Sequence, residues 1–267
     1  MSDAVSVQSS PLLDVRQLEV VYHDVATAVQ GVSIEVAHGS IVAMIGTNGA
    51  GKTTTLRAVS GFLPAEDVAI TDGEISFGGQ SLRGLLPHQI SRLGVVLVPE
   101  RDKLFQTLTV AENLNFSSTR RRRPICDAVY DYFPQLAERQ KQVAGYLSGG
   151  EKQMLAIGMA LVCEPKLLLV DELSLGLAPI VTNEIMSILH AINRNLGLAM
   201  LIVEQNAAAA LLIASFGYVM ESGRVVFKGE AKRLLEHQDM KEFYLGDRQA
   251  GGYRNIRQYT RKRRWWG

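Results

Sequence analysis

A glycine-rich loop near the start of the chain has the residue types and spacing that bind phosphate. The segment GTNGAGKTT at 46–54 follows five apolar residues at 41–45, which predict a buried strand, and precedes a run of helix formers. Glycines let backbone N–H groups turn inward around a polyphosphate, and the N-terminus of the following helix adds positive potential there. A glycine turn beside a solvated lysine is the other interpretation, and the strand in front disfavours it. The residues expected to contact the phosphates are Gly46, Asn48, Gly49, Gly51, Lys52, Thr53 and Thr54.

Two adjacent carboxylates predict the second half of the same site. Asp171 and Glu172 come directly after the apolar residues 167–170, and parallel sheets place their ligands at the carboxyl ends of the strands. We expect the Thr53 hydroxyl to hold Mg²⁺, Asp171 to bind it through water, and Glu172 to act as the general base that polarises a water molecule. Two acids in an ordinary surface turn are the alternative.

A third motif, LSGGEKQ at 147–153, predicts the start of a helix. Ser148 and Glu151 have the spacing of a capping box. That interpretation leaves two glycines in the first helical turn unexplained, because helix propensity disfavours them. Bare N–H groups at a helix start bind anions, so Ser148, Gly149 and Gly150 predict a second phosphate-binding surface.

In this order and spacing the three motifs resemble the nucleotide-binding subunit of an ABC transporter, over residues 13–246. The resemblance implies the cofactors ATP and Mg²⁺, hydrolysis of ATP, and head-to-tail pairing of two such domains. Each ATP would lie between the phosphate loop of one domain and the signature motif of the other, so that Ser148, Gly149 and Gly150 contact a nucleotide bound to a partner chain. It also implies that Tyr22 stacks on adenine, with a packed strand tyrosine as the alternative.

Two positions depart from the general family pattern. Glu100 stands where the family usually has a glutamine, and Gln205 stands at the position of the switch histidine. Glu100 can ligate Mg²⁺, whereas Gln205 can donate a hydrogen bond to a phosphate but cannot carry a proton at neutral pH. These changes either cripple the site or belong to a subfamily.

The segments around these positions resemble the LivF-type subunit of branched-chain amino acid importers. They are VPE at 98–100, LTVAENL at 108–114, SLGLAP at 174–179 and VEQNA at 203–207. Leu173 and residues 101–103 differ from that pattern. The resemblance implies a second, LivG-type ATPase subunit, two transmembrane permease subunits, an extracytoplasmic solute-binding protein as an indirect partner, and a peripheral place on the cytoplasmic face of the inner membrane. It leaves the solute open, because importers of urea, short amides or other carboxylates share much of the pattern.

Composition and charge narrow the class of protein. The chain has 267 residues, 28 Lys and Arg against 27 Asp and Glu, and two cysteines far apart in sequence, which argues against a disulfide scaffold or a structural zinc site. No apolar run is long enough to span a bilayer, and residues 1–10 do not have the pattern of a signal peptide. Basic residues gather at 120–123, which suits a solvated loop, and at 254–264 before Trp265 and Trp266. This tail suits an anionic membrane surface better than single-stranded nucleic acid, and a disordered tail is the plain alternative.

The pattern of apolar residues predicts an α/β fold, which the resemblance specifies as a P-loop ABC ATPase domain with a mixed sheet core, an antiparallel β subdomain and an inserted helical subdomain. We expect a flexible leader at 1–12, the ATPase domain at 13–246 with the helical subdomain at about 103–161, and a basic tail at 247–267. Strands are predicted at 16–22, 26–36, 41–45, 73–77, 95–98, 167–170, 200–203, 216–220 and 225–228, a loop at 64–72, and helices at 87–93, 231–236 and 241–245.

Two other functions fit parts of the sequence. A soluble ABC-type ATPase acting on nucleic acid or ribosomes is the main alternative, but such proteins usually carry two ATPase domains or a long coiled-coil insertion, neither of which is present here. A P-loop kinase or GTPase has no use for LSGGEKQ. The sequence therefore favours an importer ATPase over a nucleic-acid partner.

Overall fold

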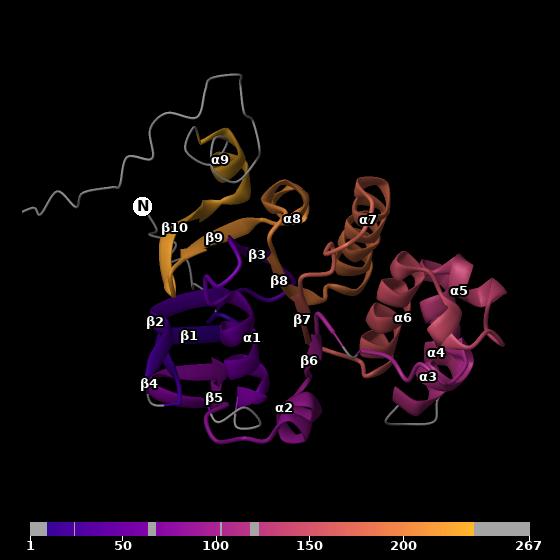
Figure 1. Ribbon diagram of the computed structural model, residues 1–267, viewed down its shortest axis with the longest axis horizontal. Coiled ribbons are helices and arrows are strands. Elements are labelled where there is room, and N and C mark those ends of the chain that lie inside the picture. The colour runs from indigo at the N-terminus through magenta and orange to yellow at the C-terminus, as the bar shows by residue number, and fades with distance from the viewer. Residues whose placement is uncertain (1–9, 24, 64–67, 102, 118–122, 238–267) are drawn as a thin grey trace, which may run out of the picture.

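The computed structural model describes residues 10–23, 25–63, 68–101, 103–117 and 123–237. Within these residues the chain forms two sheets with helices between and beside them (Figure 1). The α/β class with a mixed sheet and an antiparallel sheet is confirmed. The leader up to residue 9, residues 120–122 of the first basic stretch, the helix expected at 241–245 and the basic tail lie outside the described residues.

The larger sheet has six strands in the order β10-β9-β3-β8-β7-β6. All neighbours are parallel except β9 and β10, which form a hairpin around Ser222 and Gly223. The central strands are buried on both faces, as their continuous apolar sequences predict. The bounds are β3 Ile41–Gly46, β6 Val95–Val98, β7 Leu167–Asp171, β8 Ala199–Glu204, β9 Phe216–Glu221 and β10 Arg224–Glu230.

The smaller sheet is antiparallel, in the order β2-β1-β4-β5. Its strands are β1 Leu13–Tyr22, β2 Ala26–Val36, β4 Val68–Phe77 and β5 Gln80–Ser81. The expectation of a loop over 64–72 is wrong from Val68 onward, because Val68 pairs with Tyr22 and Ile70 pairs with Val20 across β1. Pairing along the whole of β1 extends the strand through a polar stretch that has no clear alternation of its own.

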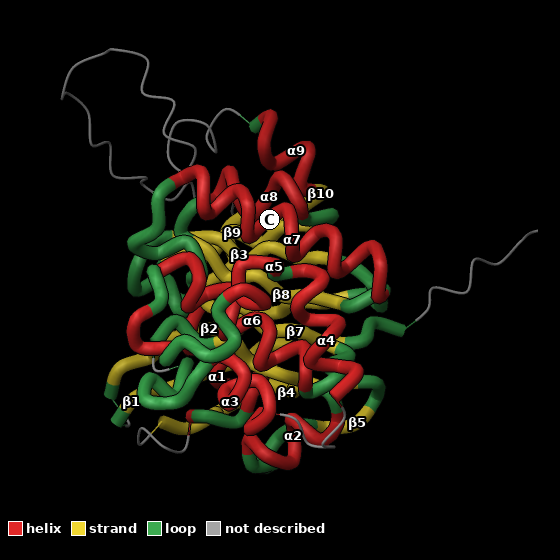
Figure 2. Tube along the Cα trace, turned by 90° about the vertical axis from the view of Figure 1, so that its right-hand side faces the viewer, coloured by secondary structure: helices red, strands yellow, loops and turns green. Residues whose placement is uncertain are grey.

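Nine α-helices are described, and helix α1 lies between the two sheets (Figure 1). Helices α3, α4, α5 and α6 lie together on the side away from the antiparallel sheet, and in Figure 2 helices cover the strands on that side. A capping box precedes α3, since Thr109 N donates to Glu112 at 2.8 Å and Glu112 N donates to the Thr109 hydroxyl at 3.2 Å. The bounds are α1 Lys52–Ser60, α2 Pro87–Leu93, α3 Val110–Ser117, α4 Arg123–Tyr132, α5 Pro134–Glu138, α6 Gly149–Val162, α7 Pro179–Leu196, α8 Ala207–Ile213 and α9 Ala231–Glu236.

Alternate residues of the six-stranded sheet enter two different cores. Val42 and Met44 of β3 face the core that contains α1 and the antiparallel sheet. Ala43 and Ile45 face the core that contains α6, α7 and α8. Because both cores close on β3, the loop that follows this strand is held from two sides.

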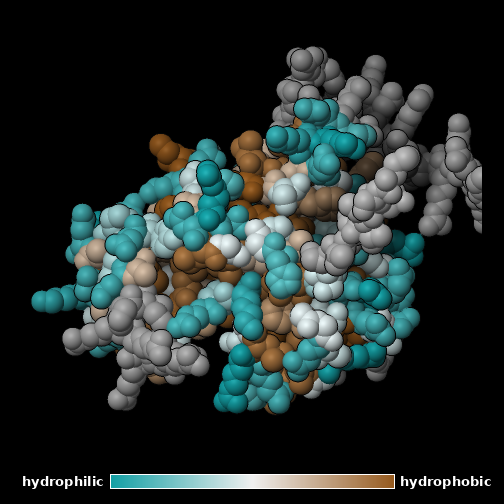
Figure 3. Space-filling view, turned by 180° about the vertical axis from the view of Figure 1, so that it is seen from behind, coloured by the Kyte–Doolittle hydropathy of each residue, from teal (hydrophilic) through white to brown (hydrophobic). Residues whose placement is uncertain are grey.

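The described residues contain no helix that is long and apolar enough to cross a membrane. Polar side chains cover much of the face seen from behind, and apolar side chains appear in patches between them (Figure 3). A cavity of about 920 Å³ lies between α4, α6 and α7, with Val129, Leu161 and Ile188 in its lining. It contains none of the residues with predicted chemistry.

Candidate functional site

The glycine-rich loop connects β3 to α1, as its sequence setting predicts. Gly51 precedes the helix with φ 96°, in the left-handed region that favours glycine. A Cβ atom on Gly51 would lie 2.6 Å from the Ala28 carbonyl oxygen, and one on Gly46 would lie 2.4 Å from that of Met220. Any side chain at these two positions would displace the backbone around the loop.

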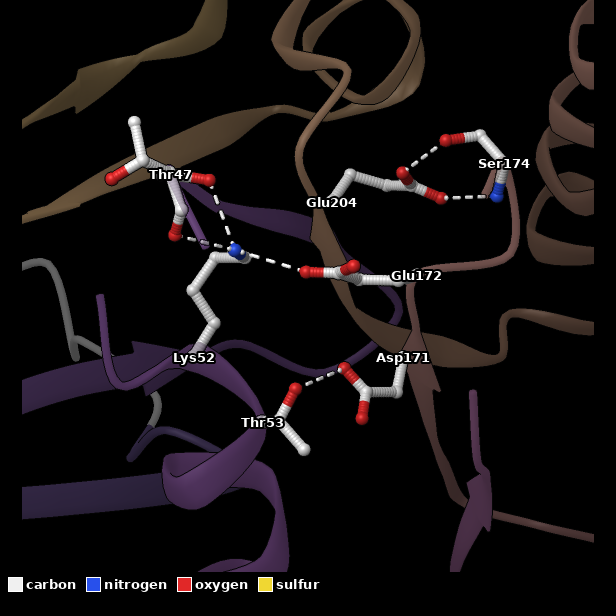
Figure 4. A network of polar contacts seen from close by, with 8 residues as sticks. Thr47, Lys52, Thr53, Asp171, Glu172, Ser174 and Glu204 are labelled. Atoms are coloured by element: carbon white, nitrogen blue, oxygen red, sulfur yellow. Dashed lines mark hydrogen bonds and ion pairs between the residues drawn. The ribbon is translucent and has the colours of Figure 1, made fainter. Parts of the chain in front are cut away.

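Lys52 is a buried, positively charged residue at the first position of α1. Its ammonium group donates to the carbonyl oxygens of Gly46 at 2.9 Å and Thr47 at 3.0 Å, and lies 3.0 Å from Oε1 of Glu172 (Figure 4). The side chain is only 3% exposed, so its charge acts with little screening by water. This places a cation beside the loop N–H groups, where a polyphosphate would need one.

Thr53 and Asp171 bring together two side-chain oxygen atoms from different elements. The Thr53 hydroxyl donates to Oδ1 of Asp171 at 3.0 Å, across the gap between α1 and the end of β7 (Figure 4). Burial raises the pKa of Asp171 to about 6, the hydrogen bond from Thr53 opposes the shift, and the charges of Glu172 and Glu100 add to it. A bound cation would relieve this penalty.

The donor set fits Mg²⁺ bound together with phosphate. Magnesium in such sites takes one or two protein oxygens and completes its shell with substrate phosphates and water, so a hydroxyl and a carboxylate suffice. No group of three His, Cys, Asp or Glu side chains suited to a metal occurs among the described residues, and this mode of binding does not require one. Glu100 lines the same cavity.

Glu172 adopts a conformation that is rare for a residue with a side chain. Its φ is 45°, and its N–H donates to the Val203 carbonyl oxygen of β8 at 2.9 Å. Backbone strain of this kind persists only where the surrounding structure holds it, and it gathers at functional sites. In this conformation the Glu172 carboxylate lies beside the Lys52 ammonium group.

A cavity of about 400 Å³ opens over the loop. Glu172 and Leu175 line one part of it, and Glu100 and Arg101, which form an ion pair at 3.0 Å, line another. The rest of its lining is Ala28, Asn48, Gly49, Ala50, Gly51, Lys52, Thr53 and Thr54. The structure thus brings together most of the predicted phosphate contacts with Glu172 and Glu100.

Tyr22 is half-buried at the end of β1, where its hydroxyl group lies 3.1 Å from Oγ1 of Thr54. This contact connects the tyrosine to the loop helix and leaves its role toward adenine a prediction.

The LSGGEKQ motif begins α6 with the expected capping box. Ser148 N donates to Glu151 at 2.8 Å, and Glu151 N donates to the Ser148 hydroxyl at 3.3 Å. Ser148, Gly149 and Gly150 line a separate cavity of about 380 Å³, which shares no lining residue with the cavity over the phosphate loop. Within one chain, therefore, the structure does not bring the two predicted phosphate surfaces together.

Gln205 is exposed and lines a third cavity with Glu172 and Glu204. Glu204, which the motifs did not single out, is a carboxylate that is 1% exposed and accepts hydrogen bonds from both the N–H and the hydroxyl of Ser174 (Figure 4). Its position directly after the apolar run 199–203 was the sequence signal that could have identified it.

Lys103 is a half-buried residue that the motifs also did not predict, and it lies near the charges of Glu100, Asp171 and Glu204. It donates to Gln153 of α6, and burial lowers its pKa to about 8, although the nearby charge of Glu100 opposes this shift. Nothing in the local sequence predicts a buried lysine here, because the contact joins residues 50 positions apart.

Comparison with known proteins finds relatives among the ATP-binding proteins of transporters. Residues 29–174 match the family model described as ABC transporter. The chain is 43% identical over 229 residues to the high-affinity branched-chain amino acid transport ATP-binding protein BraG of Pseudomonas aeruginosa, covering 84% of this chain and 96% of that protein. It is 36% identical over 219 residues to the probable branched-chain amino acid transport ATP-binding protein LivF of Archaeoglobus fulgidus, covering 80% and 91%. A solved ADP conformation of an ATP-binding cassette of an ABC transporter has a TM-score of 0.76 at 25% identity, covering 90% of this chain and all of that one.

Proposed function

Because the chain belongs to the ABC transporter family of ATP-binding proteins and is an ATPase, we propose that it powers an importer of branched-chain amino acids or related small solutes. The observation that carries the nucleotide site is the cluster in which Lys52, Thr53, Asp171 and Glu172 meet beside the glycine loop. The cargo is suggested by the names of the two similar transport proteins.

In the proposed mechanism the loop N–H groups and Lys52 hold the β- and γ-phosphates of ATP. Thr53 and Asp171 would hold Mg²⁺, which neutralises charge on the phosphates when bound. Lys52 would exchange its contact with Glu172 for one with phosphate, and this frees the carboxylate. Glu172 then orients a water molecule and accepts its proton as general base.

Completion of the site needs a second ATPase subunit. We infer a head-to-tail pair in which Ser148, Gly149 and Gly150 of one chain approach the nucleotide on the other, because one chain keeps the two surfaces in separate cavities. The partner would be a LivG-type subunit. Two permease subunits and, indirectly, a solute-binding protein complete the importer, with this chain peripheral on the cytoplasmic face of the inner membrane.

Glu100 and Gln205 receive roles consistent with their surroundings. Glu100 lines the phosphate cavity and adds an oxygen ligand near Asp171, with Arg101 balancing its charge. Gln205 follows β8 and would donate a hydrogen bond to the γ-phosphate. The basic tail with Trp265 and Trp266 would contact anionic lipid beside the permeases.

Co-purification from mildly solubilised membranes tests the importer. A tagged full-length chain should recover a second, different ATPase and two polytopic proteins, identified by mass spectrometry. Recovery of the chain alone, or of ribosomes or nucleic acid, would contradict the proposal.

Turnover of ATP by Glu172→Gln tests the general base. The change keeps the size of the side chain and removes the basic oxygen, so we expect the rate to fall by about a hundredfold or more while ATP still binds. Unchanged turnover would assign the proton transfer to another group. Glu221→Gln, at the exposed end of strand β9 in the same sheet, is the matched control.

A further inference from the structure

Glu204 is a buried acid for which the proposed mechanism has no use. It ends β8, and its two carboxylate oxygens accept separate hydrogen bonds from Ser174, one from the N–H at 3.0 Å and one from the hydroxyl group (Figure 4). Burial raises its pKa. A buried acid of this kind destabilises a fold relative to an apolar side chain of similar volume, unless its hydrogen bonds compensate.

Ser174 lies in the turn 172–177, which begins with the strained Glu172. The N–H of Glu172 donates to the main chain of Val203, and Ser174 donates to the side chain of Glu204. Two successive residues of β8 therefore hold the turn at two points. Inside the turn, Leu177 N donates to the Ser174 carbonyl oxygen at 3.1 Å, so a shift of Ser174 would reach its far end.

Both ends of this turn line the cavity that Gln205 also lines, and each end in addition lines a cavity that the other does not reach. Glu172 and Leu175 line the cavity over the phosphate loop, whereas Gly176 and Leu177 line the cavity at the start of α6. A Cβ atom on Gly149 would lie 3.2 Å from Cδ2 of Leu177, so the end of the turn packs closely on the signature glycines.

We propose that Glu204 is a positioning residue that fixes the turn 172–177, and with it the Glu172 carboxylate opposite Lys52 and Leu177 against Gly149. Glu204 acts through the two hydrogen bonds to Ser174, and its charge is not required. The inference rests on the proposed role of Glu172.

Substitution of Glu204 separates positioning from stability. Glu204→Leu removes both acceptors and a buried charge, so the unfolding midpoint should stay or rise while kcat for ATP falls by about tenfold to a hundredfold, since small misplacements of a reacting group have effects of this size. The KM for ATP should change by less than about twofold, because Lys52 and the loop are untouched. Glu204→Gln should restore turnover, since its amide can accept from the Ser174 N–H and donate to the Ser174 hydroxyl.

The assay uses the full-length chain with the proteins that co-purify with it, and hydrogen exchange reports the turn directly. The Ser174 amide should exchange faster in Glu204→Leu and at the parent rate in Glu204→Gln and in the control Glu221→Gln. If Glu204→Leu does not fold, Ser174→Ala takes its place, with a smaller loss of kcat expected because the N–H bond remains.

Three results would overturn the inference: parental kcat in Glu204→Leu, a parallel loss of kcat and stability, or equal losses in the Leu and Gln variants. Failure of the underlying mechanism has a different signature. If Glu172→Gln keeps its turnover, the general-base role is wrong, whereas the exchange rate of Ser174 still tests the hold of Glu204 on the turn.

Discussion

Asp171 holds a negative charge in a place that disfavours it. Its pKa of about 6 lies above the ordinary value of 3.8, so the folded chain binds the proton more tightly than the unfolded chain does. The stabilisation from this group is therefore full below about pH 4 and is lost as the pH rises through 6. Near neutral pH and without metal, the ionised carboxylate destabilises the fold by about 3 kcal/mol.

Asp171→Asn should consequently raise stability at neutral pH. In the absence of Mg²⁺ we expect a gain of about 2 to 3 kcal/mol in the free energy of unfolding above pH 6, shrinking to nothing below about pH 4. Urea unfolding at several pH values measures it, with the exposed Asp131→Asn as control. A gain that is equal at acid and neutral pH would show that the pKa of Asp171 is not raised. With MgATP the order should reverse, since only the parent gains from binding.

Tyr22 allows its two interpretations to be separated by a pair of substitutions. If the ring stacks on adenine, Tyr22→Ala should weaken ATP binding by about five- to a hundredfold, the range that base stacking gives. Tyr22→Phe should keep the affinity, because it loses only the contact with Thr54. Equilibrium binding of a fluorescent ATP analogue measures both. Equal affinities for the Ala variant and the parent would leave Tyr22 a packing residue.

The sequence predicts those site residues that lie close to one another along the chain. The loop, the acid pair and the Ser148 cap lie within short motifs, and the structure places each on the expected element. Glu204 and Lys103 were missed because their partners, Ser174 and Gln153, are 30 and 50 residues away. Each of these hydrogen-bonded pairs is brought together only when the chain folds.

At the scale of the elements, a substitution in α6 can show whether Gly150 of the LSGGEKQ motif is needed for packing or for binding. A Cβ atom on Gly150 would lie 2.6 Å from Cγ1 of Val181 in α7, so Gly150→Ala should destabilise the chain by about 1 to 3 kcal/mol. Adding Val181→Ala removes the clash and should restore the unfolding midpoint, measured by thermal denaturation.

ATP turnover of the doubly substituted chain then decides the role of Gly150. We expect turnover to remain low, because a methyl group would still stand at the anion-binding helix start. Full turnover would mean that the glycine serves only the packing of α6 on α7. Val181→Ala alone is the control.

For some helices and strands, the pattern of apolar residues was sufficient to predict the bounds. Helix α2 and strand β6 have the bounds predicted from Pro87 and the apolar run 95–98. The start of β4 and the whole of α8 were missed. β4 is set by pairing with β1, and α8 is an alanine-rich segment, 207–213, without the polar face that marks a surface helix.

At the scale of the whole molecule, the separation of the two proposed phosphate surfaces supports the proposal of a second chain. β3, β7 and β8 place the loop and the acid pair at one sheet edge, while Ser148 lies at the start of α6 in another cavity. ATP bound at the first surface would therefore join two subunits, and loss of its γ-phosphate would release them.

Association should accordingly depend on ATP and on both surfaces. We expect Glu172→Gln, mixed with the second ATPase subunit, to form a pair in MgATP and to remain apart in ADP, as measured by light scattering. Lys52→Ala should abolish the pair by weakening ATP binding, and Ser148→Arg should abolish it while ATP still binds, because Ser148 is remote from the cavity of its own loop. Pairing that survives Ser148→Arg, or that forms equally in ADP, would place the contact between subunits elsewhere on the molecule.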